Sequence, residues 1–256
     1  MPAAGLDPIL EGVWGAATWP QATDFARAGL LSLGDIAPAY RQARDRKFDA
    51  FARLLQPYAT GDVLDVGAGG PDLLERLSAS TRIATDILPA DRRAPGIGYV
   101  VQSRSDLLPF DDHAFDTVLM TGMAHHLVPD DRNRLLREVH RCLRPGGCAV
   151  LLEETFDDAR GCGESSEPAM KPLSAQFDAL SDADRLTFLA FTDWWGNRVM
   201  KGSDAIPLPM TFLSIREWAS TLGDAHLAVT STQLLGLMSG GGHLATPRAL
   251  IVATRR

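Results

Sequence analysis

Short apolar runs alternate with helix-like segments through the middle of the chain. The runs at 63–66, 82–86, 97–101, 115–120 and 148–153 are bounded by polar residues, glycine or proline, which is typical of buried strands. Residues 130–143 place apolar side chains three and four positions apart, which predicts an amphipathic helix that ends at the Arg-Pro-Gly-Gly segment 144–147. A helix is also expected after Pro71, from the spacing of Leu73, Leu74 and Leu77. Strands that alternate with helices predict an α/β fold, in which helices cover both faces of a mostly parallel sheet.

The flanking segments have different patterns. Residues 22–56 have apolar positions at helical spacing, whereas 155–214 is irregular, rich in glycine and proline, and helical only at 182–200. A helix at 216–222 and two strands, 227–235 and 248–254, follow, with a hairpin loop at 239–242. We therefore expect one compact domain in four parts. These are an N-terminal helical cap (1–60), a core (61–154), an insertion or lid (155–214) and C-terminal strands that complete the sheet (215–256).

Composition narrows the class of protein. The 256 residues carry a formal net charge of -7, which disfavours nucleic acid as a partner because phosphate-binding proteins are normally basic. No segment has the roughly 18 apolar residues of a membrane span, so a membrane partner is not expected either. Three cysteines without a CxxC pair favour free thiols in a cytoplasmic protein and suggest no metal site. Nothing in the sequence indicates the oligomeric state.

Three features in the core suggest a nucleotide-like ligand. The glycine-rich turn 65–70 follows a predicted strand and precedes a predicted helix, where backbone N–H groups are free to meet a ligand. Asp86 ends the next strand, 21 residues after Asp65, and could accept hydrogen bonds from a ribose diol or simply cap a turn. Asp106 precedes an apolar pair ahead of a strand, where it could bind an adenine amino group while Leu107 packs against the ring.

The order of these motifs resembles the Rossmann-fold (class I) S-adenosylmethionine (SAM)-dependent methyltransferases, over roughly residues 60–154. The resemblance rests on VLDVGAG at 63–69, Asp86, DLLPF at 106–110, FDTVL at 115–119, HHL at 125–127 and LRPGG at 143–147. It implies a Rossmann-like seven-stranded sheet with the last strand antiparallel, and SAM as cofactor with S-adenosylhomocysteine as product. Pro71 stands where the family often has a third glycine, which changes the expected start of the following helix.

The resemblance also implies cofactor contacts at individual positions. Asp65 would orient the glycine loop and the amino-acid end of SAM, Asp86 would hold the ribose, and Asp106 with Leu107 would hold the adenine. The full set of expected cofactor-binding residues is Asp65, Gly67, Ala68, Gly69, Asp86, Ile87, Asp106, Leu107 and Thr121.

The acceptor side has weaker signals. His125 and His126 follow a central strand at the edge where ligands bind, so one of them could be a general base, or both could shape the loop. Glu153 ends the next strand and could bind the acceptor or remain solvated. Four residues of the insertion are further acceptor-binding candidates, although the tryptophans could equally belong to the core: Trp194, Trp195, Asn197 and Arg198.

The sequence thus predicts a cytoplasmic methyltransferase that acts on an oxygen or nitrogen atom of a small-molecule acceptor, in bacterial specialised metabolism. Two alternatives remain open. One is a methyltransferase that acts on tRNA or protein, and the other is a SAM-binding protein of this fold that catalyses a cyclisation or serves as a sensor.

Overall fold

A seven-stranded sheet organises the computed structural model, which describes residues 11–13, 15–32, 35, 37–157, 170–238 and 245–256. Its strands lie in the order β3-β2-β1-β4-β5-β7-β6. The strand bounds are β1 Asp62–Val66, β2 Thr81–Asp86, β3 Gly98–Val101, β4 Phe115–Thr121, β5 Leu143–Glu154, β6 Leu227–Met238 and β7 Thr246–Arg255. β1 to β5 are parallel to one another, whereas β7 runs antiparallel to both β5 and β6. The predicted α/β fold with one antiparallel strand is confirmed.

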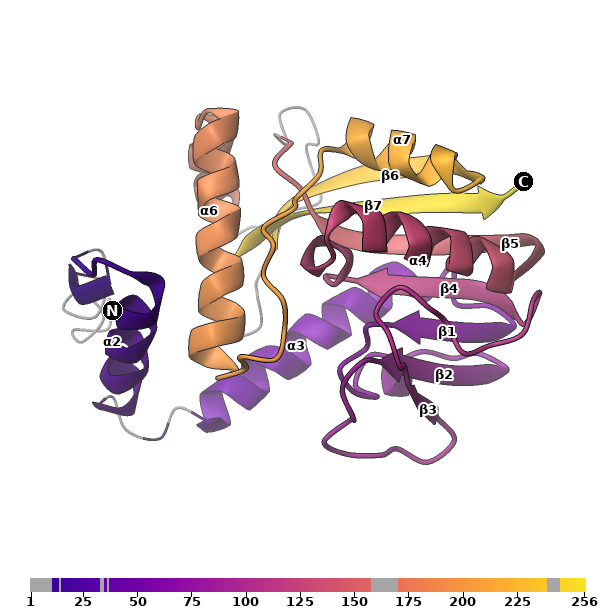
Figure 1. Ribbon diagram of the computed structural model, residues 1–256, viewed down its shortest axis with the longest axis horizontal. Helices are drawn as coiled ribbons and strands as arrows, with labels where there is room; N and C mark the ends of the chain where they lie inside the picture. The colour runs from indigo at the N-terminus through magenta and orange to yellow at the C-terminus, as the bar shows by residue number, and fades with distance from the viewer. Residues whose placement is uncertain (1–10, 14, 33–34, 36, 158–169, 239–244) are drawn as a thin grey trace.

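Helices cover both faces of the sheet. On one face lie α4 (Pro129–Cys142), next to β5, and α7 (Ile215–Asp224), next to β6 and β7 (Figure 1). Leu136, Val139 and Trp218 of these helices are buried in the core on this face. On the other face α3 (Ala37–Leu55) buries Phe51 and Leu55 against strands from the same sheet. This burial on both faces explains why the central strands are nearly continuous apolar runs.

The carboxyl ends of the parallel strands meet at one edge, beside α6 (Asp182–Trp194) and the N-terminal half of α3 (Figure 1). α6 continues into a π-helical turn, η4 (Trp195–Met200), so the helix predicted at 182–200 is confirmed with a change of winding. α5 (Lys171–Asp178) precedes α6, and α2 (Trp19–Ser32) packs against its far side. Ligands of open α/β sheets bind at this edge.

Two helix predictions are wrong in detail. The single stretch at 22–56 is two helices, α2 and α3, and Pro38 lies in the first turn of α3, where its missing N–H has no effect. The helix expected after Pro71 is only a 3-10 turn, η1 (Leu74–Arg76). The chain must return at once to begin β2, and the Ser80 N–H already bonds the Gly61 carbonyl 2.9 Å away, so no length remains for a helix.

The C-terminal pairing is confirmed, since β6 and β7 are antiparallel neighbours. The hairpin loop predicted at 239–242 lies outside the described residues, as does the first part of the predicted lid, 158–169. No helix in the described ranges is long and apolar enough to cross a membrane.

Candidate active site

The glycine loop leaves β1 at the carboxyl edge of the sheet. The backbone N–H groups of Gly67 and Ala68 both donate to the Thr85 carbonyl, at 2.9 and 3.2 Å. Gly67 and Gly69 have φ values of +68° and +63°, which side chains rarely tolerate. A methyl group on Gly69 would meet no described atom within 4 Å, so this part of the loop borders open space.

Asp86 fixes the loop to the next strand. One carboxylate oxygen accepts from the Gly69 N–H and the other from the Leu88 N–H, both at 2.9 Å. A carboxylate has about four acceptor positions, so each oxygen can still accept a further hydroxyl group. Asp86 therefore has the capacity to bind a diol while it shapes the glycine loop.

Asp65 is a buried carboxyl group without a partner. It is 1% exposed, and neither oxygen makes a hydrogen bond to any described residue. Burial, with the nearby charge of Asp86, raises the pKa of Asp65 to about 8. A buried carboxyl group without a hydrogen-bond partner lowers the stability of the fold unless a cationic or hydrogen-bond donor group binds it. The position of Asp65 therefore points to a ligand that carries such a group.

Two of the predicted cofactor residues have exposed apolar side chains. Ile87 is 36% exposed and Leu107 is 44% exposed, as suits residues that flank a planar ring. Asp106 is already engaged: Arg104 binds it at 2.9 and 2.7 Å and Arg134 at 2.5 Å. These two guanidinium groups lower its pKa to about 2, so any adenine amino group would share an oxygen with an arginine.

The turn after β4 brings the paired histidines to the glycine loop. β4 ends at Thr121, and the side chain of Met123 lies so close to Gly67 that an added methyl group there would be 2.7 Å from Met123 Cγ. His125 and His126 follow in the 3-10 turn η2 (Ala124–His126). The histidines thus stand within one turn of the proposed cofactor contacts.

Glu153 fixes the position of His125. Its Oε1 accepts from the N–H groups of Met123 and Ala124, at 2.9 and 2.8 Å, and its Oε2 lies 2.8 Å from His125 Nδ1. Burial opposes charge on His125, but Glu153 and then Asp193 outweigh it and raise the pKa of the imidazole well above its usual value. The buried pair orients the turn, and Glu153 is not the solvated residue that one reading of the sequence allowed.

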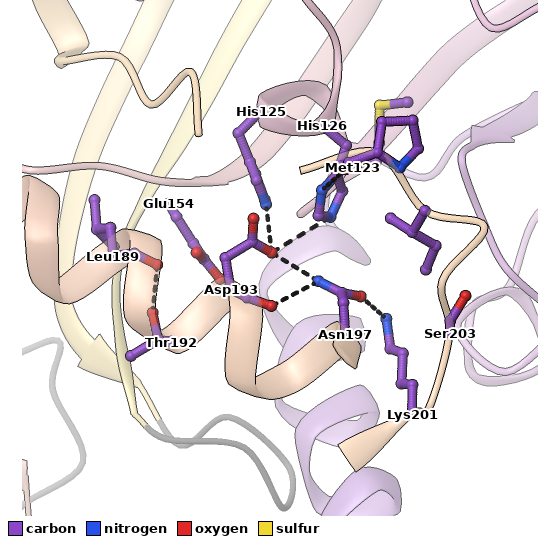
Figure 2. A network of polar contacts seen from close by, with 12 residues as sticks. Met123, His125, His126, Glu154, Leu189, Thr192, Asp193, Asn197, Lys201 and Ser203 are labelled. Atoms are coloured by element: carbon purple, nitrogen blue, oxygen red, sulfur yellow. Dashed lines mark hydrogen bonds and ion pairs between the residues drawn. The ribbon is translucent and has the colours of Figure 1, made fainter. Parts of the chain in front are cut away.

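Asp193 of α6 completes a compact polar cluster. Its Oδ1 lies 3.6 Å from His125 Nε2 and 3.7 Å from His126 Nε2, and it accepts a 2.7 Å hydrogen bond from Asn197 Nδ2 (Figure 2). The Asn197 Oδ1 in turn accepts from Lys201 Nζ at 3.0 Å. His126 Nδ1 faces the Pro207 carbonyl at 3.1 Å, while burial and the charge of His125 lower the His126 pKa to about 3. His126 is therefore neutral, with its Nε2 lone pair directed toward Asp193.

The other candidates from the insertion lie apart from this cluster. Trp194 and Trp195 are buried in a core with α2, where Trp194 Nε1 donates to Thr23 Oγ1 at 3.0 Å. Arg198 donates to the carbonyls of Ser203 and Ile206 and so braces the segment after η4. Of the four, only Asn197 reaches the histidines, through Asp193.

Sequence reasoning missed Asp193, which links α6 to the histidine turn. One signal was available, since Asp193 is an acid inside the apolar segment Phe191–Trp195, where its neighbours had to be buried. It also missed Arg248 of β7, whose Nη2 donates to Glu154 at 2.9 Å at the end of β5. No local pattern joins those two residues, which are 94 positions apart.

Residues 64–151 match the family profile described as "Methyltransferase domain". The match spans the glycine loop, Asp86, Asp106 and the histidine turn, which are the elements gathered at the carboxyl edge. These residues form a Rossmann-like, SAM-dependent methyltransferase domain.

Known proteins resemble this chain in sequence over part of its length and in fold over most of it. The chain is 32% identical over 117 residues to the ubiquinone/menaquinone biosynthesis C-methyltransferase UbiE of Pectobacterium carotovorum, which covers 45% of this chain and 41% of that protein. The chain thus matches less than half the length of this relative. Among solved structures, a chain from a complex of the Haloferax volcanii Trm112 methyltransferase activator has a TM-score of 0.54 at 18% identity, over 85% of this chain and 94% of that one. The [4+2]-cyclase SpnF has a TM-score of 0.52 at 14% identity, over 81% and 80%. These structural likenesses establish the fold.

The edge of the sheet fits SAM on its own geometry. The partnerless Asp65 carboxyl suits the cofactor's cationic amino-acid end, the open space beside Gly69 suits a ligand against the backbone, and Asp86 has acceptor capacity left for the ribose. Ile87 and Leu107 offer apolar surface for the adenine. The contacts predicted for each residue remain predictions.

Proposed function

We propose that this protein transfers a methyl group from SAM to an oxygen or nitrogen atom of a small-molecule acceptor, as a cytoplasmic enzyme of bacterial specialised metabolism. The observation that carries the proposal is the polar cluster of His125, His126 and Asp193, on the turn whose Met123 lies against Gly67 of the glycine loop. The cluster joins the turn after β4 to α6, and its side chains are largely buried, which favours a compact acceptor over a macromolecule. The acidic net charge also disfavours tRNA.

When bound, SAM supplies an electrophilic methyl group with a good leaving group. The chain's own task is then to align the acceptor with that methyl group, which can contribute roughly 7–11 kcal/mol to lowering the barrier. His126 Nε2 can accept a hydrogen bond from a hydroxyl or amine of the acceptor, with Asp193 beside it to accept a second. The low pKa of His126 makes it a weak base, so alignment is the larger contribution that we assign to it.

Two competing functions have their own support. SpnF, which has a similar fold, is named as a [4+2]-cyclase, so this fold can also belong to a protein named for a reaction other than methyl transfer. The UbiE relatives are named as C-methyltransferases, but this chain covers only 41–48% of their length, at 28–32% identity. For this reason we do not carry their carbon acceptor over to this chain.

Three measurements test the proposal. Titration calorimetry should show that S-adenosylhomocysteine binds and that NAD does not; the reverse result would refute the cofactor assignment. Mass spectrometry of the purified protein should identify any SAM, S-adenosylhomocysteine or acceptor that it retains. In a separate assay, the protein should release S-adenosylhomocysteine when it is given SAM and acceptors that contain a hydroxyl or amine group. Methylation of bulk tRNA or protein in place of these acceptors, or retention of SAM without turnover, would favour one of the alternatives.

A further inference from the structure

Three ligand-type side chains from two distant parts of the chain converge on one point. His125, His126 and Asp193 each present one donor atom, and these atoms all lie within 4.8 Å of one another. The histidines come from the turn after β4, and Asp193 comes from the last turn of α6 (Figure 2). From this geometry we infer that the cluster is a binding site for a divalent transition-metal ion of the zinc class.

Hydrogen bonds on the outer nitrogens fix which atoms face the centre. His126 Nδ1 faces the Pro207 carbonyl, which can only accept, so Nδ1 carries the proton and Nε2 is left with a lone pair. His125 Nδ1 lies 2.8 Å from a carboxylate oxygen of Glu153. A carboxylate or carbonyl behind each imidazole is the arrangement that orients histidine ligands in metal sites. Both Nε2 atoms therefore face Asp193. His126 Nε2 has a free lone pair, and His125 Nε2 gains one when the metal ion displaces its proton.

The separations fit metal ligands better than direct hydrogen bonds. The two Nε2 atoms lie 3.6 and 3.7 Å from Asp193 Oδ1, beyond the normal range of N–H···O bonds. Two ligands about 2.1 Å from a tetrahedral zinc ion are roughly 3.4 Å apart, close to both values. The Asp193 side chain is only 3% exposed, and its second oxygen is buried and makes no hydrogen bond with any described residue. This partnerless oxygen is a second potential ligand atom on Asp193.

The local charge is compatible with a cation. Glu153 and Asp193 bring two carboxylates, Lys201 is held by Asn197 Oδ1, and Arg248 is paired with Glu154. Two imidazoles and one carboxylate suit Zn²⁺, Co²⁺ or Fe²⁺, whereas Mg²⁺ prefers an all-oxygen shell. Three protein ligands leave at least one position open, as in catalytic metal sites, and an acceptor hydroxyl could occupy it. The metal titration described next contains neither cofactor nor acceptor. Its result is therefore independent of the proposed methyl transfer.

The test is a titration of the EDTA-treated, dialysed protein with Zn²⁺ in the presence of millimolar Mg²⁺. We expect one Zn²⁺ per chain, with binding weakened more than about 100-fold in Asp193→Asn and in His126→Gln. His226→Gln is the matched control, because His226 is an exposed histidine in edge-to-face contact with His140 and its loss should leave the affinity unchanged. Absence of stoichiometric binding, or equal binding by wild type and both site variants, overturns the inference.

A measurement on the unaltered protein guards against variants that fail to fold. Co²⁺ in place of Zn²⁺ should give the strong visible absorption of a four- or five-coordinate ion, and one equivalent of Zn²⁺ should abolish it. Weak absorption typical of six-coordinate Co²⁺, unaffected by Zn²⁺, would mean that the ion sits on surface carboxylates and would refute the site.

Discussion

Replacing Asp65 by asparagine should stabilise the ligand-free protein and weaken cofactor binding. The folded chain holds the Asp65 proton up to about pH 8, whereas an unfolded aspartate loses it near pH 4. Between these values the folded state binds more protons, so the free energy of unfolding falls as the pH rises. At pH 7.5 the gap is roughly 3.6 pH units at 1.36 kcal/mol each, or about 5 kcal/mol.

Asparagine removes this penalty but leaves a buried amide without a partner, at a cost of about 1–3 kcal/mol. We therefore expect Asp65→Asn to gain roughly 2 kcal/mol at pH 7.5, which raises the melting temperature by about 4–8 °C for a chain of this size. The same change should weaken S-adenosylhomocysteine binding by roughly 10- to 100-fold, because a charged hydrogen bond contributes about 1.5–3 kcal/mol.

Denaturant unfolding of wild type and variant between pH 5 and 8 measures the effect. The difference in unfolding free energy should widen with rising pH, since only wild type carries the titrating acid. Asp106→Asn is the matched control: its carboxyl has a pKa lowered to about 2 by Arg104 and Arg134, so its loss should destabilise the fold by about 1 kcal/mol. A less stable Asp65→Asn, or a pH-independent difference, would contradict the account of Asp65 as a buried acid awaiting a partner.

Three further predictions concern the site. Asp86→Ala should weaken SAM binding about 10- to several-hundred-fold in calorimetry; unchanged affinity would mean that another residue holds the ribose. Gly69→Ala should cost only about 1 kcal/mol of stability, because the added methyl group enters open space, but that group should impair SAM binding there. Gly67→Ala should destabilise the fold more, because its methyl group collides with Met123. Equal unfolding midpoints for the two variants would refute this contrast. In metal-free buffer, His126→Ala should slow single-turnover methyl transfer about tenfold at every pH and leave SAM affinity intact. His125→Ala should slow the transfer and also lower the melting temperature. If His126→Ala instead loses about 100-fold in rate and recovers it at high pH, His126 is a base.

The geometry that we assign to the cofactor was predictable because its signals are local. Gly67, Gly69 and Asp86 lie at strand ends, and strand ends follow from runs of buried residues. The helix expected after Pro71 failed for a non-local reason, because the chain there must return to pair Ser80 with Gly61. Periodicity records which residues can form a helix but not how much chain the connection leaves for one.

The acceptor half depends on contacts that no spacing encodes. Asp193 reaches His125 across 68 positions of sequence, and the aromatic residues around it looked like the functional feature. The structure assigns Trp194 and Trp195 to packing against α2 instead. A tryptophan at helical spacing is consistent with a pocket or a core, and only the tertiary neighbours distinguish them.

The strand order has a consequence for the timing of assembly during synthesis. β7 lies between β5 and β6, so β6 has no partner in the sheet until the strand that follows it has left the ribosome. Until then β6 has unsatisfied backbone edges on both sides, which is the state in which strands associate wrongly. β1 to β5 can pair as they emerge, but Arg248 reaches Glu154 only with β7 in place. The end of β5 that carries Glu154 should therefore reach its final structure last, after the glycine loop and Asp86 have formed on β1 and β2.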